Sequence, residues 1–306
     1  MDRRDFLKGT AALALTVGIA GRLGNAAAAE QQPPAEGKTP DLVALRGDSP
    51  AEMVDAGIAL FGGMSAFVKP GQSVVIKPNI GWDRPPESGA NTNPELVGRM
   101  VSRCLEAGAK EVSVFDHTCD NWVASYSKSG IRAAVEAAGG KMVSGAVEED
   151  YREVDIPGAV NMKKAKVHRL ILDSDVFFNV PVLKHHGGAK LTCAMKNFMG
   201  LVWDRRHMHA NNLQQCIADA SLIRRPDLNV VDAFRVMTTG GPRGNANSVV
   251  RNLRSLLLSR DIVAVDTASA RMIDFPLSTI GHIPAGQKLG LGTTELGKLD
   301  IRRVVL

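Results

Sequence analysis

From residue 43 onward, short apolar runs alternate with longer segments in which apolar residues recur every three or four positions. This alternation first predicts strands at 43–46, 73–77 and 112–115, and helices at 50–67 and 94–107. Because a helix between two strands lets the second strand run in the same direction as the first, the order predicts an α/β fold. We expect a mostly parallel, twisted sheet with helices on both faces. Further strands are predicted at 141–143, 151–155, 167–172, 175–183, 228–231, 256–258 and 301–305, and further helices at 130–138, 211–220 and 262–273.

The first 29 residues have the pattern of a twin-arginine export signal. Arg3 and Arg4 precede a moderately apolar run at 10–20, and small residues follow at 26–29. The run is shorter than the roughly 20 residues that span a membrane, so we expect no membrane span in the mature protein and a periplasmic location. An uncleaved signal kept as an anchor is the alternative. The export machinery is then a partner of this chain.

A segment rich in Pro and Gln at 30–40 predicts a disordered linker between the signal and the folded domain at 41–306. The roughly 265 residues of that domain suit one large α/β domain or two closely joined lobes. Without residues 1–29, the chain has 33 Lys and Arg against 30 Asp and Glu. This slight excess gives no reason to expect a nucleic-acid partner, whereas small anions remain candidate ligands.

The cysteines lack the Cys-x-x-Cys spacing of iron–sulfur and structural zinc sites. We therefore expect no ferredoxin-type iron–sulfur cluster in this chain. Three of the cysteines fall in helical patterns beside Ala, Leu or Met, where a free thiol usually acts as a small buried apolar group. The chain has four in all: Cys104, Cys119, Cys193 and Cys216.

The stretch 181–200 places basic and imidazole groups directly after a predicted buried strand. Lys184, His185 and His186 end that strand, two glycines follow, and a helical pattern begins near 191 and continues to 202. Because the first turn of a helix carries unpaired N–H groups, we expect an anion to bind there. A glycine-rich turn with solvated lysines is the alternative.

Polar residues also end three other predicted strands: Lys77 and Asn79, then Asp116 and His117, then Asp232. In open parallel sheets the ligand crevice lies beyond the carboxyl ends of the strands. We therefore predict one shared crevice. Its residues fall into a lysine and asparagine set that binds substrate (Lys77, Asn79, Lys184, Lys196, Asn197) and a catalytic set of histidines and aspartates (His185, His186, Asp116, Asp232).

The two sets suit different tasks. Lysines hold a carboxylate or phosphate as point charges, and asparagines orient it with neutral hydrogen bonds. Imidazole titrates near neutrality and also binds transition metals, so His185 and His209 are candidate metal ligands. Each type has an ordinary alternative: solvated lysines, surface histidines and aspartates that cap helices. The loop 240–244, with Arg243, either covers the crevice or forms a surface turn.

Two long segments carry a family resemblance: IKPNIGWDRPPESGANTNPELV at 76–97 and NVPVLKHHGGAKLTCAMKNFMGLV at 179–202. With Asp116, Asp232 and Gly241-Pro242 in this order, the chain resembles the family called domain of unknown function 362 over 41–306. The most specific pieces are Lys77-Pro78-Asn79 and Lys196-Asn197-x-x-Gly200. Many relatives carry a ferredoxin-like segment that this chain lacks, and the family implies no established reaction.

No Gly-x-Ser-x-Gly elbow, nucleoside-triphosphate loop or dinucleotide glycine motif occurs. The sequence therefore favours an exported enzyme acting on a small carboxylate or phosphate in the predicted crevice. The alternative is a periplasmic ligand- or metal-binding module that serves a redox partner without catalysis. The cofactor is left open, with a transition metal as the candidate.

Overall fold

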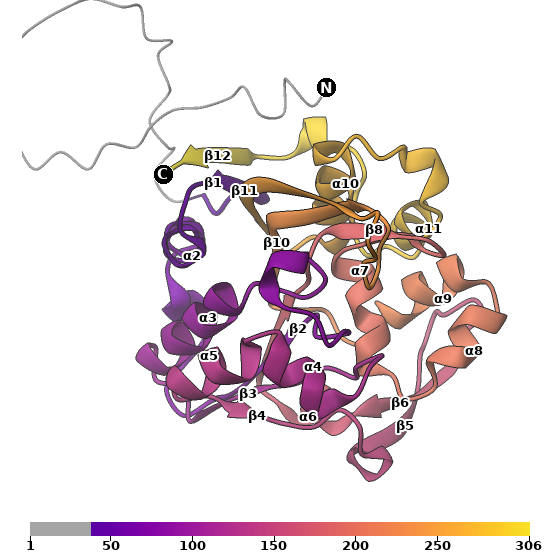
Figure 1. Cartoon of the computed structure of the whole chain (residues 1–306), viewed down its shortest axis with the longest axis horizontal. Coiled ribbons are helices and arrows are strands. Elements are labelled where there is room, and N and C mark those ends of the chain that lie inside the picture. Colours follow the sequence, from indigo (N-terminus) through magenta and orange to yellow (C-terminus); the bar gives the residue numbers. More distant parts are fainter. Residues whose placement is uncertain (1–37) are drawn as a thin grey trace, which may run out of the picture.

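The computed structural model describes residues 38–306, and their main feature is one sheet of eight strands (Figure 1). Among these strands β11 alone runs against the others, so the sheet is mixed but mostly parallel, as predicted. The spatial order is β12 (Ile301–Val305), β1 (Leu42–Arg46), β11 (Val249–Ser259), β10 (Leu228–Thr239), β7 (Val176–Val180), β2 (Ser73–Pro78), β3 (Glu111–Val114) and β4 (Lys141–Met142).

Helices cover both faces of this sheet (Figure 1). One face carries α2 (Pro50–Leu60), α3 (Pro94–Glu106), α4 (Trp122–Lys128) and α5 (Ile131–Ala137). The other carries α7 (Ala194–Asn197), α9 (Leu213–Ala220), α10 (Ile262–Met272) and α11 (His282–Lys288). Two small antiparallel sheets, each of two strands, and two short helices complete these elements: β5 (Tyr151–Asp155) with β6 (Lys164–His168), β8 (Lys184–His186) with β9 (Lys190–Thr192), α6 (Arg169–Asp173) and α8 (Arg205–Ala210).

The two apolar cores follow from the alternation of side chains along the strands. In β2, Val74 and Ile76 belong to the core that also contains apolar residues of α2 and α3, whereas Val75 belongs to the core on the other face. In β7, Phe178 lies in the same core as Val74 and Ile76, and Phe177 lies in the same core as Val75. Each such side chain contributes roughly 1.5–3 kcal/mol when it is fully buried, so the central strands stabilise both layers at once.

Two of the predicted helices show how local signals set their ends. The helix predicted at 94–107 forms as α3, since Pro94 occupies its first turn and the Asn93 side chain accepts the Glu95 N–H at 3.0 Å. The helix predicted at 50–67 ends instead at Leu60. Gly62 and Gly63 have φ of +94° and +82°, a conformation that ends a helix.

The prediction of a helix that begins near 191 was wrong. Residues Lys190–Thr192 form β9, which pairs with β8, and α7 starts only at Ala194 and has four residues. The first N–H groups of α7, on Ala194 and Met195, donate to the buried Asp266 carboxylate at 2.7 and 3.1 Å. The anion at this helix start is therefore a side chain of the protein, and not a ligand.

The strand predicted at 167–172 was also placed wrongly, because β6 ends at His168 and α6 follows directly. The His168 side chain accepts the N–H of Leu170 at 3.2 Å and so caps the new helix. The signal peptide and most of the linker predicted at 30–40 lie outside the described residues.

Candidate functional site

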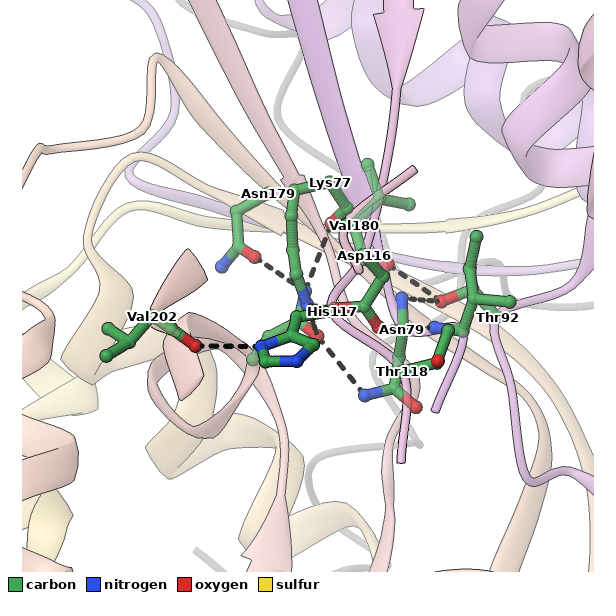
Figure 2. A network of polar contacts seen from close by, with 12 residues as sticks. Lys77, Asn79, Thr92, Asp116, His117, Thr118, Asn179, Val180 and Val202 are labelled. Atoms are coloured by element: carbon green, nitrogen blue, oxygen red, sulfur yellow. Dashed lines mark hydrogen bonds and ion pairs between the residues drawn. The ribbon is translucent and has the colours of Figure 1, made fainter. Parts of the chain in front are cut away.

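Seven side chains predicted for the site line one cavity of about 50 Å³ where β2 and β3 end. They come from segments far apart in sequence, which the parallel strands and the β8–β9 hairpin bring together at the carboxyl ends of the central strands. Figure 2 shows three of them, Lys77, Asn79 and Asp116, whose side chains point toward one another. The seven are Lys77, Asn79, Asp116, Lys184, His186, Lys196 and Asn197.

Lys77 forms a buried ion pair at the base of the cavity. Its ammonium lies 2.8 Å from Asp116 Oδ1 and donates to Asn197 Oδ1 at 2.7 Å (Figure 2). The second Asp116 oxygen accepts the Ile80 N–H at 2.7 Å. Burial lowers the pKa of Lys77, and the Asp116 charge opposes that shift. Both oxygens of the Asp116 carboxylate therefore have partners, one in the Lys77 ammonium and the other in the backbone that follows β2.

Lys184 is as deeply buried, with 1% of its surface exposed, but its partners are neutral. Its ammonium donates to Asn79 Oδ1 at 3.0 Å and to the carbonyl of Ala90. Burial lowers the pKa of Lys184 to about 7, and the charge of Lys196 acts in the same direction. Near neutral pH this lysine therefore exists both with and without its proton, as a general acid or base requires.

Lys196 differs from both, because its ammonium forms no hydrogen bond or ion pair with any residue from 38 to 306. The side chain is half-buried and lines the cavity from α7. Burial lowers the pKa of Lys196 to about 8, with smaller effects in the same direction from Arg205 and Lys77. Its charge and its donors are therefore free for a ligand.

His186 can donate to the cavity but is a poor base. Its Nδ1 lies 3.1 Å from the Gly188 N–H and 3.0 Å from the Ala189 N–H, so it accepts both, and the neutral ring carries its proton on Nε2. Burial, together with Lys196 and Lys184, lowers the pKa of His186 to about 2. The ring therefore stays neutral, and the role that suits it is to donate a hydrogen bond through Nε2.

Asn197 joins α7 to the ends of the central strands. Its amide nitrogen donates to the Lys77 carbonyl at 3.0 Å and to Asn179 Oδ1 at 2.9 Å, while its oxygen accepts from Lys77 and from Asn79 Nδ2 at 3.3 Å. All of its hydrogen-bonding capacity is used within the protein. Asn197 therefore holds Lys77 and Asn79 in place, and a direct role of Asn197 in substrate binding stays a prediction.

His185, which the sequence grouped with the catalytic residues, lies away from the cavity. Alternate residues of a strand face opposite sides, so Lys184 and His186 share the cavity side and His185 does not. Its Nδ1 accepts the Gly241 N–H at 3.1 Å, and its ring lies 6.1 Å from that of Phe275. His185 therefore contacts the loop 240–244 and Phe275, and not the cavity.

Asp232 and His209 also lie outside the set of residues that line the cavity. Asp232 is buried, and its two oxygens accept the N–H groups of Asn93 at 2.8 Å and Phe234 at 2.9 Å. Burial raises the pKa of Asp232 to about 6. His209 is exposed on α8.

Nine of the lining residues were missing from the predicted sets, and four of these bear on the chemistry of the cavity. Thr192 stands opposite Lys184 in the β8–β9 hairpin, is 2% exposed, and its hydroxyl has no partner among the described residues. Arg205 donates to the carbonyls of His117 and Thr118 at 2.9 and 2.6 Å. The other two are His117 and the exposed Cys119, whose thiol lies 3.3 Å from Arg205 Nη1.

The loop 240–244 covers part of the cavity, which favours the first of its two interpretations. Pro242 lines the cavity, and Arg243 binds two carboxylates that do not line it. Its Nε lies 2.9 Å from Asp120 Oδ2, and its Nη2 lies 2.8 Å from Asp83 Oδ1. Arg243 therefore holds the loop in place, and its positive charge is already paired with two carboxylates.

A larger groove of about 810 Å³ adjoins the cavity and shares His117 and Arg205 with it. The His117 ring stacks on Trp203 with 4.9 Å between ring centroids, and its Nδ1–H donates to the Val202 carbonyl at 3.0 Å (Figure 2). Burial and then Arg205 lower the pKa of His117. The His117 ring therefore lies where the cavity and the groove meet.

No group of three or more His, Cys, Asp or Glu side chains in residues 38–306 is arranged to hold a metal ion. The pair proposed from the sequence, His185 and His209, consists of one ring bound to the loop 240–244 and one exposed ring on α8. A metal at this pair stays a prediction.

The fold and the site define an α/β protein with a small cationic cavity at the carboxyl ends of its parallel strands. The chain belongs to the family described as "Domain of unknown function (DUF362)", which matches residues 74–271, and this confirms the resemblance. Residues 1–20 match the twin-arginine translocation signal, so the chain is exported. In the part of the chain that the structure describes, no helix is both long and apolar enough to cross a membrane.

The proteins similar to this chain include one relative in sequence and two solved structures. The thylakoid-associated protein sll1697 of Synechocystis is 25% identical over 76% of this chain and 73% of its own length. A crystal structure of a Thermotoga maritima protein aligns with a TM-score of 0.43 at 11% identity over 73% of this chain. The lactate racemase apoprotein of Thermoanaerobacterium thermosaccharolyticum aligns with a TM-score of 0.44 at 12% identity over 78% of this chain. This chain spans 58% and 57% of those two structures.

Proposed function

We propose that this exported protein is a periplasmic enzyme that binds a small carboxylate or phosphate in the cavity and transfers a proton there. The observation that carries the proposal is the charge of the cavity. Lys77, Lys184, Lys196 and Arg205 all line it, and Asp116 is the one carboxylate among the lining residues, already paired with Lys77. An anion would supply the missing negative charge.

Each remaining group then has a role in the proposed reaction. Lys196 binds the anion, since its ammonium has no partner among the described residues, and Thr192, which also lines the cavity, offers a hydroxyl with no partner in that part of the chain. Lys184 exchanges a proton, because its pKa of about 7 lies near the working pH. His186 donates a hydrogen bond from Nε2 to developing negative charge.

A binding module without catalysis is the second candidate, and the contacts of the histidines favour it. Neither His185 nor His186 has a carboxylate partner within hydrogen-bonding distance among the described residues, so no oriented imidazole base is formed. The two candidates share the anion site and differ only in turnover. Replacing Lys184 by methionine separates them, because it removes the proton-transfer group.

We expect Lys196→Met to weaken binding of a sulfate or pyruvate probe by at least about tenfold, or roughly 1.4 kcal/mol. The melting temperature should stay nearly unchanged, since the Lys196 side chain makes no hydrogen bond within residues 38–306 that the variant would lose. Isothermal titration calorimetry and thermal unfolding of the full chain measure the two effects. Lys288→Met, at an exposed lysine of α11, is the matched control. If Lys196→Met binds the probe with unchanged affinity, the proposed anion site at Lys196 is contradicted.

Anion affinity should also fall as the pH rises from about 6 to about 9. Lysine is cationic below its pKa, and the pKa values of Lys184 and Lys196 are about 7 and about 8. Both charges are therefore present at the lower pH and mostly lost at the higher one, so we expect about a tenfold loss of affinity. Sulfate is a suitable probe because its own charge is constant over this range. An affinity that does not change with pH would contradict these assignments.

A further inference from the structure

We propose that Lys196 is a nucleophile that forms an imine with the carbonyl group of a 2-oxo acid, whose carboxylate is held by the neighbouring cations. This inference rests on the proposed anion site and names the substrate class for it. It follows from comparing the three lysines of the cavity, since an amine can attack a carbonyl carbon only if its lone pair is not blocked by other contacts.

The hydrogen bonds of the three lysines set them apart. Lys77 is held by Asp116 and Asn197, and Lys184 is held by Asn79 and Ala90. Lys196 has no hydrogen-bond or ion-pair partner within residues 38–306, yet it lines the same cavity. Its amine is therefore the one that can turn toward a ligand without breaking a contact.

The surroundings of Lys196 also favour its reactive form. Burial, with Arg205 and Lys77, lowers the pKa of Lys196 to about 8, so a useful fraction of the side chain is a neutral amine near neutral pH. Pro242 of the loop 240–244, which Arg243 ties to Asp83 and Asp120, lines one side of the cavity, and a covered site slows hydrolysis of an imine.

The size of the cavity suits the head of a 2-oxo acid. About 50 Å³ holds roughly three or four water-sized groups, enough for a carboxylate and the adjacent carbonyl. Arg205 stands between this cavity and the groove of about 810 Å³, where a longer substrate would extend. The carboxylate would then pair with Lys184 and Arg205, while the carbonyl carbon faces Lys196.

The proposed step balances without an external oxidant or reductant. The Lys196 nitrogen attacks the carbonyl carbon, its N–H proton moves to the oxygen, and a neutral carbinolamine forms. Lys184 then gives a proton to the hydroxyl group, which leaves as water with the electrons of the C–O bond. The nitrogen lone pair forms the C=N bond, so a protonated imine and a neutral Lys184 remain.

Trapping by reduction tests this inference on the full chain. Pyruvate is added with sodium cyanoborohydride, which reduces the imine to a stable secondary amine, and peptide mass spectrometry locates the adduct. We expect Lys196 to be labelled at least about tenfold faster than the exposed Lys288. Lys196→Arg loses the nucleophile, so it should show no adduct at this position, whereas the Lys288→Met control should be labelled at Lys196 as fast as the wild type.

The outcomes separate the two proposals. If wild-type protein binds sulfate and pyruvate by calorimetry but Lys196 is labelled no faster than Lys288, the imine is overturned and the anion site stands. If neither anion binds and no label appears, both the anion site and the imine fail. Labelling of Lys184 in place of Lys196 would also overturn the assignment, because it would identify a different nucleophile.

Discussion

Gly200→Ala is expected to lower the free energy of unfolding by about 3 kcal/mol and to abolish anion binding. An alanine Cβ at this position would lie 2.0 Å from Asp116 Oδ1 and 2.6 Å from Lys77 Nζ, far inside van der Waals contact. Both atoms belong to flexible side chains, but these are buried and bound to each other. Making room for a methyl group therefore separates the ion pair, or moves the chain that carries Gly200.

Urea denaturation of wild type and variant gives the difference in unfolding free energy. Gly297→Ala is the matched control, since a Cβ there would have no atom within 4 Å and should change stability by less than about 0.5 kcal/mol. If Gly200→Ala is as stable as this control, the tight contact between Gly200 and the Lys77–Asp116 pair is not a stabilising feature of the protein.

The same geometry gives a physical reason for the spacing Lys196-Asn197-x-x-Gly200. Asn197 ties α7 to β2 through the Lys77 carbonyl, and three residues later the backbone passes the Lys77–Asp116 pair at the distance that glycine permits. The Gly200 carbonyl then accepts the His117 N–H at 3.2 Å. One short turn therefore places Lys196 in the cavity and closes the far side of the ion pair.

Much of the fold could be predicted from the sequence, because its central strands carry strong local signals. β12 has the predicted bounds, and β1, β2 and α3 agree to within about a residue or two at each end. Each has an alternating or helical apolar pattern, and α3 also has a proline and a capping asparagine at its start. The gathering of Lys77, Asn79 and Asp116 followed from the parallel order of the strands alone.

The hairpin in 184–192 could not be predicted in this way. Leu191, Ala194 and Met195 have a helical spacing, and all three are buried, but Leu191 is buried from a strand whose pairing depends on β8. That pairing decides which side chains share a face. Once β8 is known, strand alternation separates His186 from His185, and cross-strand pairing brings Thr192 beside Lys184.

Other site residues depend on tertiary contacts that carry no local signal. Arg205 enters the cavity because its guanidinium binds the carbonyls of His117 and Thr118, more than eighty residues earlier in the chain. Asp232 was predicted to end a strand, but β10 continues to Thr239, and both Asp232 oxygens accept backbone N–H groups, which gives this residue a structural task. A strand end is therefore a guide to position, and only the contacts decide the role.

Asp116→Asn is expected to be the most destabilising of the substitutions considered, at about 3–5 kcal/mol at neutral pH. Asparagine keeps the shape and can still accept the Ile80 N–H, but it removes the charge that lies 2.8 Å from the Lys77 ammonium. Lys77 is 1% exposed, so its charge would then be buried with neutral partners only. The double variant Lys77→Met with Asp116→Asn should recover part of the loss, because it removes the unpaired charge.

The pH dependence of this loss shows whether buried charge is its cause. Burial already lowers the pKa of Lys77, and without Asp116 that pKa falls further, so the unfolded chain binds more protons than the folded one at neutral pH. Stability then rises with pH until the unfolded lysine also loses its proton near its ordinary pKa of about 10.4. Denaturation at about pH 7 and about pH 9.5 should therefore show a smaller deficit for Asp116→Asn at the higher pH. A deficit that is equal at both values would mean that lost packing, and not the charge of Lys77, destabilises the variant.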